Sequence, residues 1–462
     1  MGGLTTSLFI GSQALEAAEG ALNATSNNIA NANTPGYTRE VPQFAEGAEN
    51  LTDGVVTGGG VSLSSLQSIR DELLNNQIAQ QTSAQSSVDT QSSSLQNIQT
   101  LFTSNGEDIG SALSTLSSAL TQLSASPSSG SAQQAVLSAG QQLAQAFNTT
   151  ANGLTSAQSA ADGQVSETVS QINTLTQQIA QLNSQVGQLT AQGQDGGTVE
   201  DQRDQLVQQL SQLTGVQVSQ SSNGEDTITT GNGSPLVVGN QSFALQTTTG
   251  TNGFQQVIDS SGNNITSQIQ GGTLGGAIQI RDTTIPGFLS SLNALATQLG
   301  TAFNAAQTGG FDSTGAAGQD FFNVPTTGGA AAGISVALTS PSQIAISSTA
   351  TGASGSNGNV ANLSAALTTA PTAGGSSVEN GYSSLVFQVG NAASNASTES
   401  SAIGDTLQAL TNQQGSESGV SIDEETSNMI KFQTAYEAAA RIVSTIQQLD
   451  TDTMDMGSSQ SF

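Results

Sequence analysis

The chain has 462 residues with neither cysteine nor histidine, and its six basic and 34 acidic residues give a net charge of −28. This composition excludes disulfides, thiol or imidazole nucleophiles and zinc sites of ordinary composition. Because the lysines and arginines do not cluster, we expect no nucleic-acid binding, and the negative charge opposes binding to anionic membrane surfaces.

The N-terminal segment carries a heptad pattern. Large apolar residues recur at every seventh position, at Leu8, Leu15, Leu22 and Ile29. Leu4 and three small residues, Gly11, Ala18 and Thr25, fall four positions before them. The pattern predicts an amphipathic helix whose narrow apolar stripe needs a partner. A turn that ends this helix is predicted at Asn33, Pro35, Gly36 and Tyr37.

A polar, glycine-rich connection follows to about residue 60, as a linker or short hairpin. Helical spacing of apolar residues returns from Leu63 to Phe102. Further helices are predicted at 108–123, 131–152, 164–192 and 198–213. The abundant glutamine and serine residues would also fit a disordered tract, but apolar residues keep returning at threes and fours. We therefore predict long packed helices that form a rod-shaped domain.

The apolar period changes to two after residue 215. Short runs rich in β-branched residues occupy 216–220, 226–230, 234–238, 241–247 and 254–260, with glycine-containing turns between most of them. They predict a small antiparallel β domain. The glycine-rich segment 271–276 lacks the lysine of a phosphate loop, so we interpret it as a closely packed return to helix.

A convincing amphipathic helix is predicted at 285–306, with Pro286 in its first turn. Two strands are then predicted at 334–338 and 343–349, before another helix from about Tyr382 to Thr411.

The last predicted helix begins at Ser421, which forms a capping box with Glu424. Its apolar residues step by alternating threes and fours, at Met429, Phe432, Tyr436, Ala439, Val443 and Ile446. This is a second heptad pattern, so we expect the two terminal helices to pair as a coiled coil through these residues and the four of the first helix.

Several stretches resemble the axial proteins of the bacterial flagellum. They are SNNIANANTPGYTR from Ser26 and KFQTAYEAAARIVST from Lys431 at the two ends. Internal stretches are most similar to the hook-associated protein 1 family of the hook-filament junction, and they begin at Gly58, Glu200, Ser234 and Gly271. The resemblance implies a structural protein of the flagellum that forms a junction ring and allows the flagellin filament to assemble on the hook.

Partners and location also follow from the resemblance. It implies a homo-oligomeric ring in contact with the hook protein and with a second hook-associated junction protein, outside the cell, after export without a cleaved signal peptide. It further implies a cytoplasmic export chaperone on the last helix, for which Phe432, Tyr436, Val443 and Ile446 are candidates. The alternative is that these residues only build the coiled coil.

We therefore expect a mainly α, α+β fold in three parts. They are paired terminal helices (1–34 and 421–462), a helical rod domain (35–213, 282–308 and 376–420) and an outer β-rich domain (214–281 and 309–375).

Three other classes of function are alternatives to the junction protein. Groups of carboxylates could serve a glycosidase, at Glu107-Asp108, Glu225-Asp226, Asp312 with Asp320, and Asp423-Glu424-Glu425. Caps, turns and a solvated surface explain them more simply, and the Asp312 loop lacks the alternating ligands of a calcium loop. We expect no catalysis, cofactor or metal site. A hook or rod protein, or less plausibly a secreted adhesin, remains as an alternative.

Overall fold

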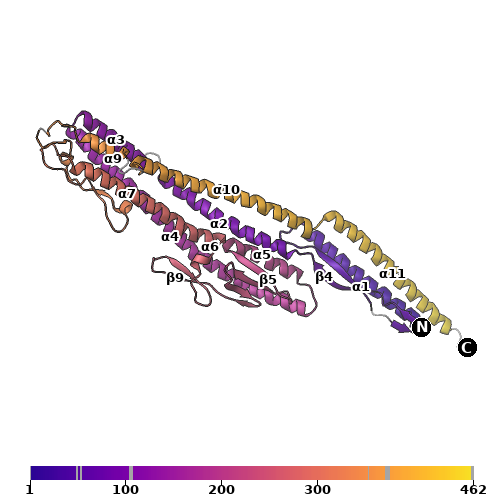
Figure 1. The fold of residues 1–462 in the computed structure, drawn as a ribbon. Coiled ribbons are helices and arrows are strands. Elements are labelled where there is room, and N and C mark those ends of the chain that lie inside the picture. The colour runs from indigo at the N-terminus through magenta and orange to yellow at the C-terminus, as the bar shows by residue number, and fades with distance from the viewer. Residues whose placement is uncertain are drawn as a thin grey trace.

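The computed structural model describes residues 2–47, 50–52, 55–103, 108–351, 353–369 and 375–458. The molecule is a long rod, and both ends of the chain lie at the same tip (Figure 1). Long helices and small antiparallel sheets confirm the mainly α, α+β prediction. No helix among the described residues is both long enough and apolar enough to cross a membrane.

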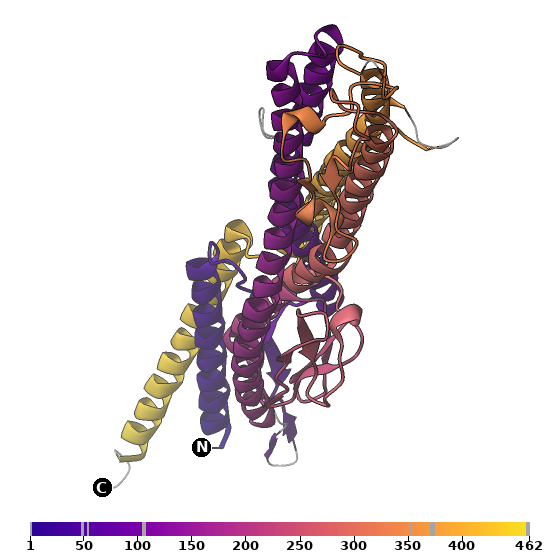
Figure 2. The same cartoon turned by 90° about the vertical axis from the view of Figure 1, so that its left-hand side faces the viewer.

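The terminal part consists of two helices and a hairpin. Helix α1 (Gly2–Asn31) and helix α11 (Ile422–Ser458) run side by side in opposite directions (Figures 1 and 2). Strands β1 (Glu40–Glu46) and β4 (Val61–Ser68) pair antiparallel and pack on α1, and β2 (Asn50–Thr52) pairs with β3 (Val55–Thr57).

Strand β4 corrects the prediction that a helix starts at Leu63. That helix, α2 (Glu72–Phe102), begins only after Asp71, whose side chain accepts the backbone N–H of Leu74. Leu63 instead packs on α1, where a Cβ atom added to Gly20 would lie 2.5 Å from its Cδ2. The apolar residues of this stretch therefore belong to a strand that packs on α1, and not to the start of a helix.

The rod is built from α2 and α3 (Ile109–Ala125), α4 (Gly130–Ala191), α5 (Gly197–Leu213), α7 (Ile285–Thr308) and α10 (Val378–Ser418). Helix α4 replaces the two helices predicted at 131–152 and 164–192. No proline interrupts it, and its buried face continues through Leu154, Gln158 and Ala161. The Gln158 amide donates to the backbone oxygen of Arg281. The buried face of α4 can therefore include this polar residue.

The β domain packs on the end of α4 nearest the terminal helices (Figure 1). Its four-stranded antiparallel sheet has the order β5 (Val216–Gln220), β6 (Asp226–Thr230), β7 (Pro235–Val238) and β8 (Gln241–Ser242). A hairpin of β9 (Gln246–Thr249) and β10 (Gln255–Ile258) follows it. Helix α6 (Gly272–Gln279) then continues through a π turn (Ile280–Thr284) into α7.

The predicted close return at 271–276 is confirmed. Gly272 has φ +63°, and a Cβ atom there would lie 2.2 Å from the backbone nitrogen of Thr214. Only glycine fits this position without moving the backbone.

Residues 309–375 differ from the expected β-rich unit. They contain two-residue strands, β11 (Phe322–Asn323) and β12 (Ser335–Val336), and short helices, α8 (Ala330–Gly333) and α9 (Val360–Thr368). The strand predicted at 343–349 makes only a bridge, between Phe311 and Ser347.

This segment shares the core of the helical bundle and not that of 214–281. The rings of Phe321 and Phe322 lie 4.8 and 5.5 Å from that of Phe303 on α7. Aromatic packing against α7 and α4 therefore makes it a cap on the far end of the bundle.

Candidate functional site

The terminal helix pair is the candidate functional site, because the expected assembly residues lie on it. The face of α1 that is fully buried carries small residues, at Gly11, Ala17, Ala18, Ala21, Ala24, Thr25 and Asn28. Leu8, Leu15, Leu22 and Ile29 lie on its flank and are only half-buried. Helix pairing in one chain thus uses the small-residue stripe rather than the leucine stripe, because small residues let backbones approach closely.

The predicted residues of α11 are unequally covered. Ala439 and Ile446 are buried, whereas Met429, Phe432 and Val443 are half-buried and Tyr436 is 39% exposed. Val443 meets α1 at Gly11, where an added Cβ would lie 2.9 Å from Cγ2 of Val443. Phe432 instead contacts Phe44 of β1, with ring centroids 6.1 Å apart.

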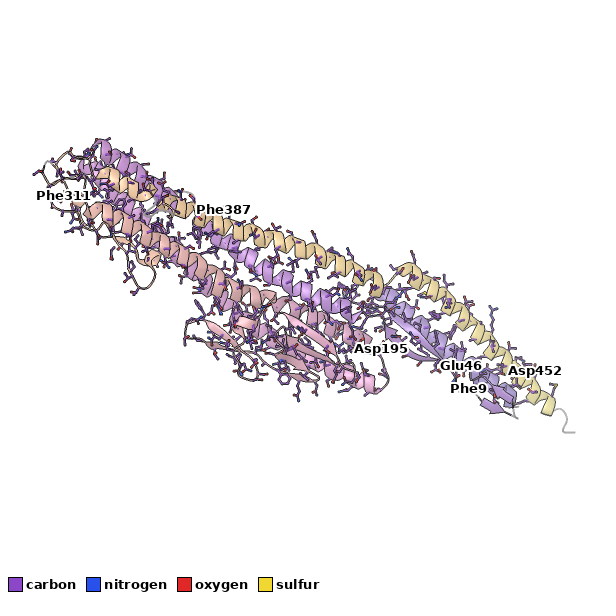
Figure 3. The ribbon with its side chains drawn as sticks, viewed as in Figure 1. Phe9, Glu46, Asp195, Phe311, Phe387 and Asp452 are labelled. Atoms are coloured by element: carbon purple, nitrogen blue, oxygen red, sulfur yellow. The ribbon has the colours of Figure 1, made fainter. Side chains whose placement is uncertain are left out.

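Large apolar side chains also remain outside this contact. On α11 they are Ile422, Ile430, Ile442, Leu449, Met454 and Met456, and on α1 Phe9, all between 50% and 64% exposed. Figure 3 shows Phe9 near the tip of the rod at which the two ends of the chain lie. One chain alone leaves much apolar surface of its terminal helices open to solvent.

The turn after α1 lies at the joint between the helix pair and the rod. Gly36 has φ +76°, which suits glycine, and the backbone oxygen of Pro35 accepts a hydrogen bond from Gln205 of α5 at 2.8 Å. The Tyr37 hydroxyl donates to Asn28 at 2.8 Å, while Asn33 is exposed. Three of the four predicted turn residues thus take part in fixing the chain direction.

Asn28 is a central residue that the sequence analysis missed. Its amide nitrogen donates to the backbone oxygen of Glu40 at 2.8 Å and to the Glu425 carboxylate at 3.2 Å. Its amide oxygen accepts from the Tyr37 hydroxyl and from the Glu40 backbone N–H. Asn28 and Glu425 are almost fully buried, so these bonds tie α1, the hairpin and α11 together. Two signals were available, its place in the SNNIANANTPGYTR motif and its position three residues after Thr25 on the small-residue stripe.

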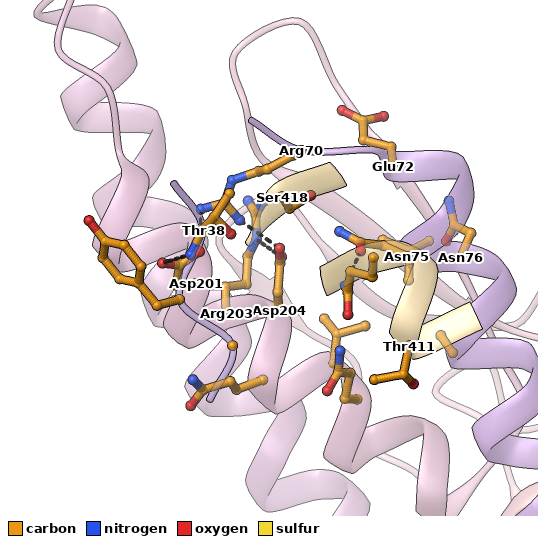
Figure 4. A pocket seen from close by; sticks show the side chains of 18 of the residues that line it. Thr38, Arg70, Glu72, Asn75, Asn76, Asp201, Arg203, Asp204, Thr411 and Ser418 are labelled. Carbon is orange, nitrogen blue, oxygen red and sulfur yellow. Dashed lines mark hydrogen bonds and ion pairs between the residues drawn. The ribbon is translucent and has the colours of Figure 1, made fainter. Parts of the chain in front are cut away.

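A second polar cluster connects the joint to α5. Arg70 lies 2.6 Å from Asp204 and 2.7 Å from Asp201, and its Nε lies 3.1 Å from Glu200. The other oxygen of Asp201 accepts the backbone N–H of Thr38 at 3.0 Å. Asp201 therefore bridges the rod and the chain segment that enters the terminal part (Figure 4).

A cavity of about 440 Å³ lies beside this cluster. Its lining comes from the turn after α1, from α2 and α5, from the β domain and from the end of α10 (Figure 4). The Arg39 backbone N–H donates to Ser418 across it, and the Arg39 guanidinium lies 2.7 Å from Glu424. Glu424 is thus an ion-pair partner, and only the Ser421 half of the expected capping box forms, with the Glu424 N–H at 3.5 Å.

Carboxylates outnumber arginines at this joint. Burial, together with the nearby Asp195 and Asp201, raises the pKa of Glu40. Burial likewise raises the pKa of the Tyr37 hydroxyl, and the charge of Glu40 adds to this shift. Burial raises the pKa of Asp226 to about 7, although Arg203 at 2.8 Å opposes the shift. Within this region Asp226 is the group whose protonation changes near neutral pH.

Most of the carboxylates considered for catalysis form structural hydrogen bonds or ion pairs, whereas Asp320 and Asp423 are exposed. Asp312 accepts bonds from Thr314 and Ala316 within its own loop, Asp226 pairs with the buried Arg203, and Glu425 binds Asn28. Glu107 lies outside the described residues. Among the residues that are described, no group of three acidic side chains is placed to hold a metal ion.

Three protein-family models match successive segments of the chain. The model of the flagellar hook-associated protein FlgK helical domain matches residues 95–322. The model of flagella basal body rod proteins matches residues 8–38, in α1 and its turn, and that of the C-terminal part of flagellar basal body rod FlgEFG proteins matches residues 413–456, which include most of α11.

Flagellar hook-associated protein 1 of Escherichia coli is 27% identical over 93% of this chain and 96% of its own length. The protein of that name from Salmonella typhimurium is 26% identical over 67% of this chain, and the matched part spans only 58% of its length.

The fold is similar to that of the flagellar hook junction protein FlgK from Burkholderia pseudomallei. The TM-score is 0.65 at 20% sequence identity, over 74% of this chain and the whole of that one. With the family-model match across the rod, the rod-protein matches at both ends and the full-length relative, the chain belongs to the flagellar hook-associated protein 1 family.

Proposed function

We propose that this protein is a structural component of the hook-filament junction of the bacterial flagellum and allows the flagellin filament to assemble on the hook. The observation that carries the proposal is the combination of parts in one chain. Helices that match rod proteins pair with each other at one tip, and residues 95–322 of the rod match the hook-associated helical domain.

Assembly of many copies into a ring is part of the proposal. Supporting it, α11 leaves Ile442, Leu449 and Met456 at least half exposed, seven residues apart on one stripe. Burying each such side chain is worth roughly 1.5–3 kcal/mol. The half-buried leucines of α1 add a second apolar stripe. A neighbouring copy that packs on these stripes would remove them from water, so the exposed surface favours an oligomer.

We propose three structural parts for the chain, with 309–375 now assigned to the helical rod and not to the β domain. The terminal helices and hairpin make the inner part, the long helices with 309–375 make the wall, and 214–281 makes a domain on the outside of the wall. Support comes from the cores, because the bundle core and the β-domain core are separate and neither includes α1 or α11.

Hook protein on one side and a second hook-associated junction protein on the other are the proposed neighbours of the ring. We also propose that an export chaperone binds α11 in the cytoplasm through Phe432, Tyr436, Val443 and Ile446. Exposed Tyr436 supports this, since a helix that binds in a groove presents apolar residues at such spacing. Tyr436→Asp should then lower both secretion of the protein and its retention on hooks.

The proposed role is structural and not catalytic, and the proposed location is the flagellum outside the cell, reached without a cleaved signal peptide. Most of the acidic side chains that were candidates for catalysis have structural partners where they are described, whereas Asp320 and Asp423 are exposed. Cells that lack the protein test the proposal by electron microscopy and by assay of flagellin in the medium.

Completed hooks without filaments, and flagellin lost to the medium, are expected. Absent hooks would move the protein to the hook or the rod. Normal filaments would contradict a flagellar assembly role and return the adhesin alternative.

A further inference from the structure

Two of the basic residues of this acidic chain form no ion pair within the described residues. Four of its six basic side chains, Arg39, Arg70, Arg203 and Arg281, lie in ion pairs. Lys431 and Arg441 of α11 are exposed and form no ion pair with any residue that the structure describes. Between Thr426 and Leu449 the only other charged residue of α11 is Glu437, which leaves this stretch with a charge of +2 − 1 = +1.

Helix α1 carries the complementary charge. Glu16 and Glu19 are its only charged side chains. Both are exposed, and neither is ion-paired within the described part of the chain. The helix pair therefore carries two unpaired acidic side chains on α1 and two unpaired basic side chains on the middle stretch of α11, whose ends are acidic.

The acidic residues of α1 and the basic residues of α11 also lie at similar positions along the axis of the helix pair. Gly11 and Val443 lie at the same level, because they touch. At a rise of about 1.5 Å per residue, Arg441 lies about 3 Å from that level toward the joint, Glu16 about 7.5 Å, Glu19 about 12 Å and Lys431 about 18 Å. The two glutamates thus fall between the two cations, within reach of long flexible basic side chains.

We propose that Lys431 and Arg441 of one copy bind Glu16 and Glu19 of the next copy, so that α11 of each copy faces α1 of its neighbour at the same level. This inference rests on the proposed ring and names the contact that holds it. It is a heterologous contact, which uses two different surfaces of each copy and closes into a ring when the rotation fits.

Charge explains why such a contact is needed. Copies with a net charge of −28 repel one another, and apolar stripes alone do not fix the level at which two helices meet. Opposite charges at one level favour the correct register and disfavour the others, which is the usual contribution of exposed ion pairs to association.

Charge reversal in cells that lack the endogenous protein tests the contact. Lys431→Glu with Arg441→Glu should cause the loss of most filaments, and so should Glu16→Lys with Glu19→Lys. All four substitutions in one chain should restore filaments, because the opposite charges then meet again. A matched control, Gln433→Glu with Gln447→Glu, adds negative charge at exposed positions on other sides of α11 and should leave filament number unchanged.

Two results would overturn the inference: wild-type filament numbers with either reversal alone, or no restoration when all four substitutions are combined. The protein in the medium is measured in parallel, and if the α11 reversal blocks export, the α1 reversal carries the test. Filaments in cells without any copy of the protein would instead refute the proposed function itself, so the two failures are distinguishable.

Discussion

Gly11 and Val443 form a tight contact between the two terminal helices, since a Cβ atom on Gly11 would lie 2.9 Å from Cγ2 of Val443. A valine side chain has one strongly preferred rotamer in a helix and cannot easily move aside. Helix pairing at this level therefore depends on the absence of a side chain at position 11.

Gly11→Ala should weaken the pairing of α1 with α11 in spite of the better helix propensity of alanine. Propensity favours alanine by about 1 kcal/mol, but overpacking of a tight contact typically costs about 1–3 kcal/mol. The measurement is hydrogen exchange of the α1 amides in the full chain, which should become faster.

Gly3→Ala is the matched control, because no atom lies within 4 Å of a Cβ atom at that position of the same helix. It should slow exchange or leave it unchanged. Slower exchange in Gly11→Ala as well would show that the contact is looser than the structure implies.

Arg70→Gln should be among the most destabilising substitutions in the protein. It would leave Glu200, Asp201 and Asp204 without their shared cation in a largely buried site, and breaking a buried ion pair costs about 3–5 kcal/mol. Urea unfolding followed by circular dichroism measures the change. Arg441→Gln, at an exposed unpaired position, should change the unfolding midpoint little; equal effects of the two substitutions would contradict this account.

The stability of the β domain should depend on pH through Asp226. Its pKa is about 7 in the folded chain and is near its ordinary value of 3.8 when unfolded, so the folded state holds a proton that the unfolded state releases. Stability from this group is complete below about pH 4 and is lost as the pH rises through about 7, with a slope of up to about 1.4 kcal/mol per pH unit.

Asp226→Asn removes this titration without a large change in shape. The free energy of unfolding of the wild-type chain should fall relative to that of the variant between pH 5 and pH 8. Parallel curves for the two proteins would show that Arg203 keeps Asp226 ionised throughout this range.

The two halves of α10 should differ in local stability. All its buried residues lie between Val378 and Ala396, and within the described helix none lies between 397 and 418. The second half is held to α2 by polar contacts such as Gln414 with Asn75 at 2.6 Å. Amides of 397–418 should therefore exchange with solvent faster than those of 378–396. Uniform protection along α10 in the isolated chain would contradict this.

Local features of the fold could be predicted from the sequence, whereas features that depend on distant parts of the chain could not. The heptads of α1 and α11, the turn at Gly36 and the strands from residue 216 were all visible, because helix period, strand period and turn chemistry are local properties. Gln158 in the middle of α4 hid the continuity of that helix, since its role in packing depends on Arg281.

Sequence by itself thus determined the mainly α frame, the inserted β domain and the family, because these follow from periodicity and from the motifs at both ends. Tertiary structure alone decided that the small residues of α1 and not its leucines are buried, that 309–375 caps the bundle, and that Asp201 joins Arg70 to Thr38. A pattern shows which residues are apolar or charged. Which of them are covered or paired depends on partners elsewhere in the chain, in several cases more than a hundred residues away, and only packing brings those partners together.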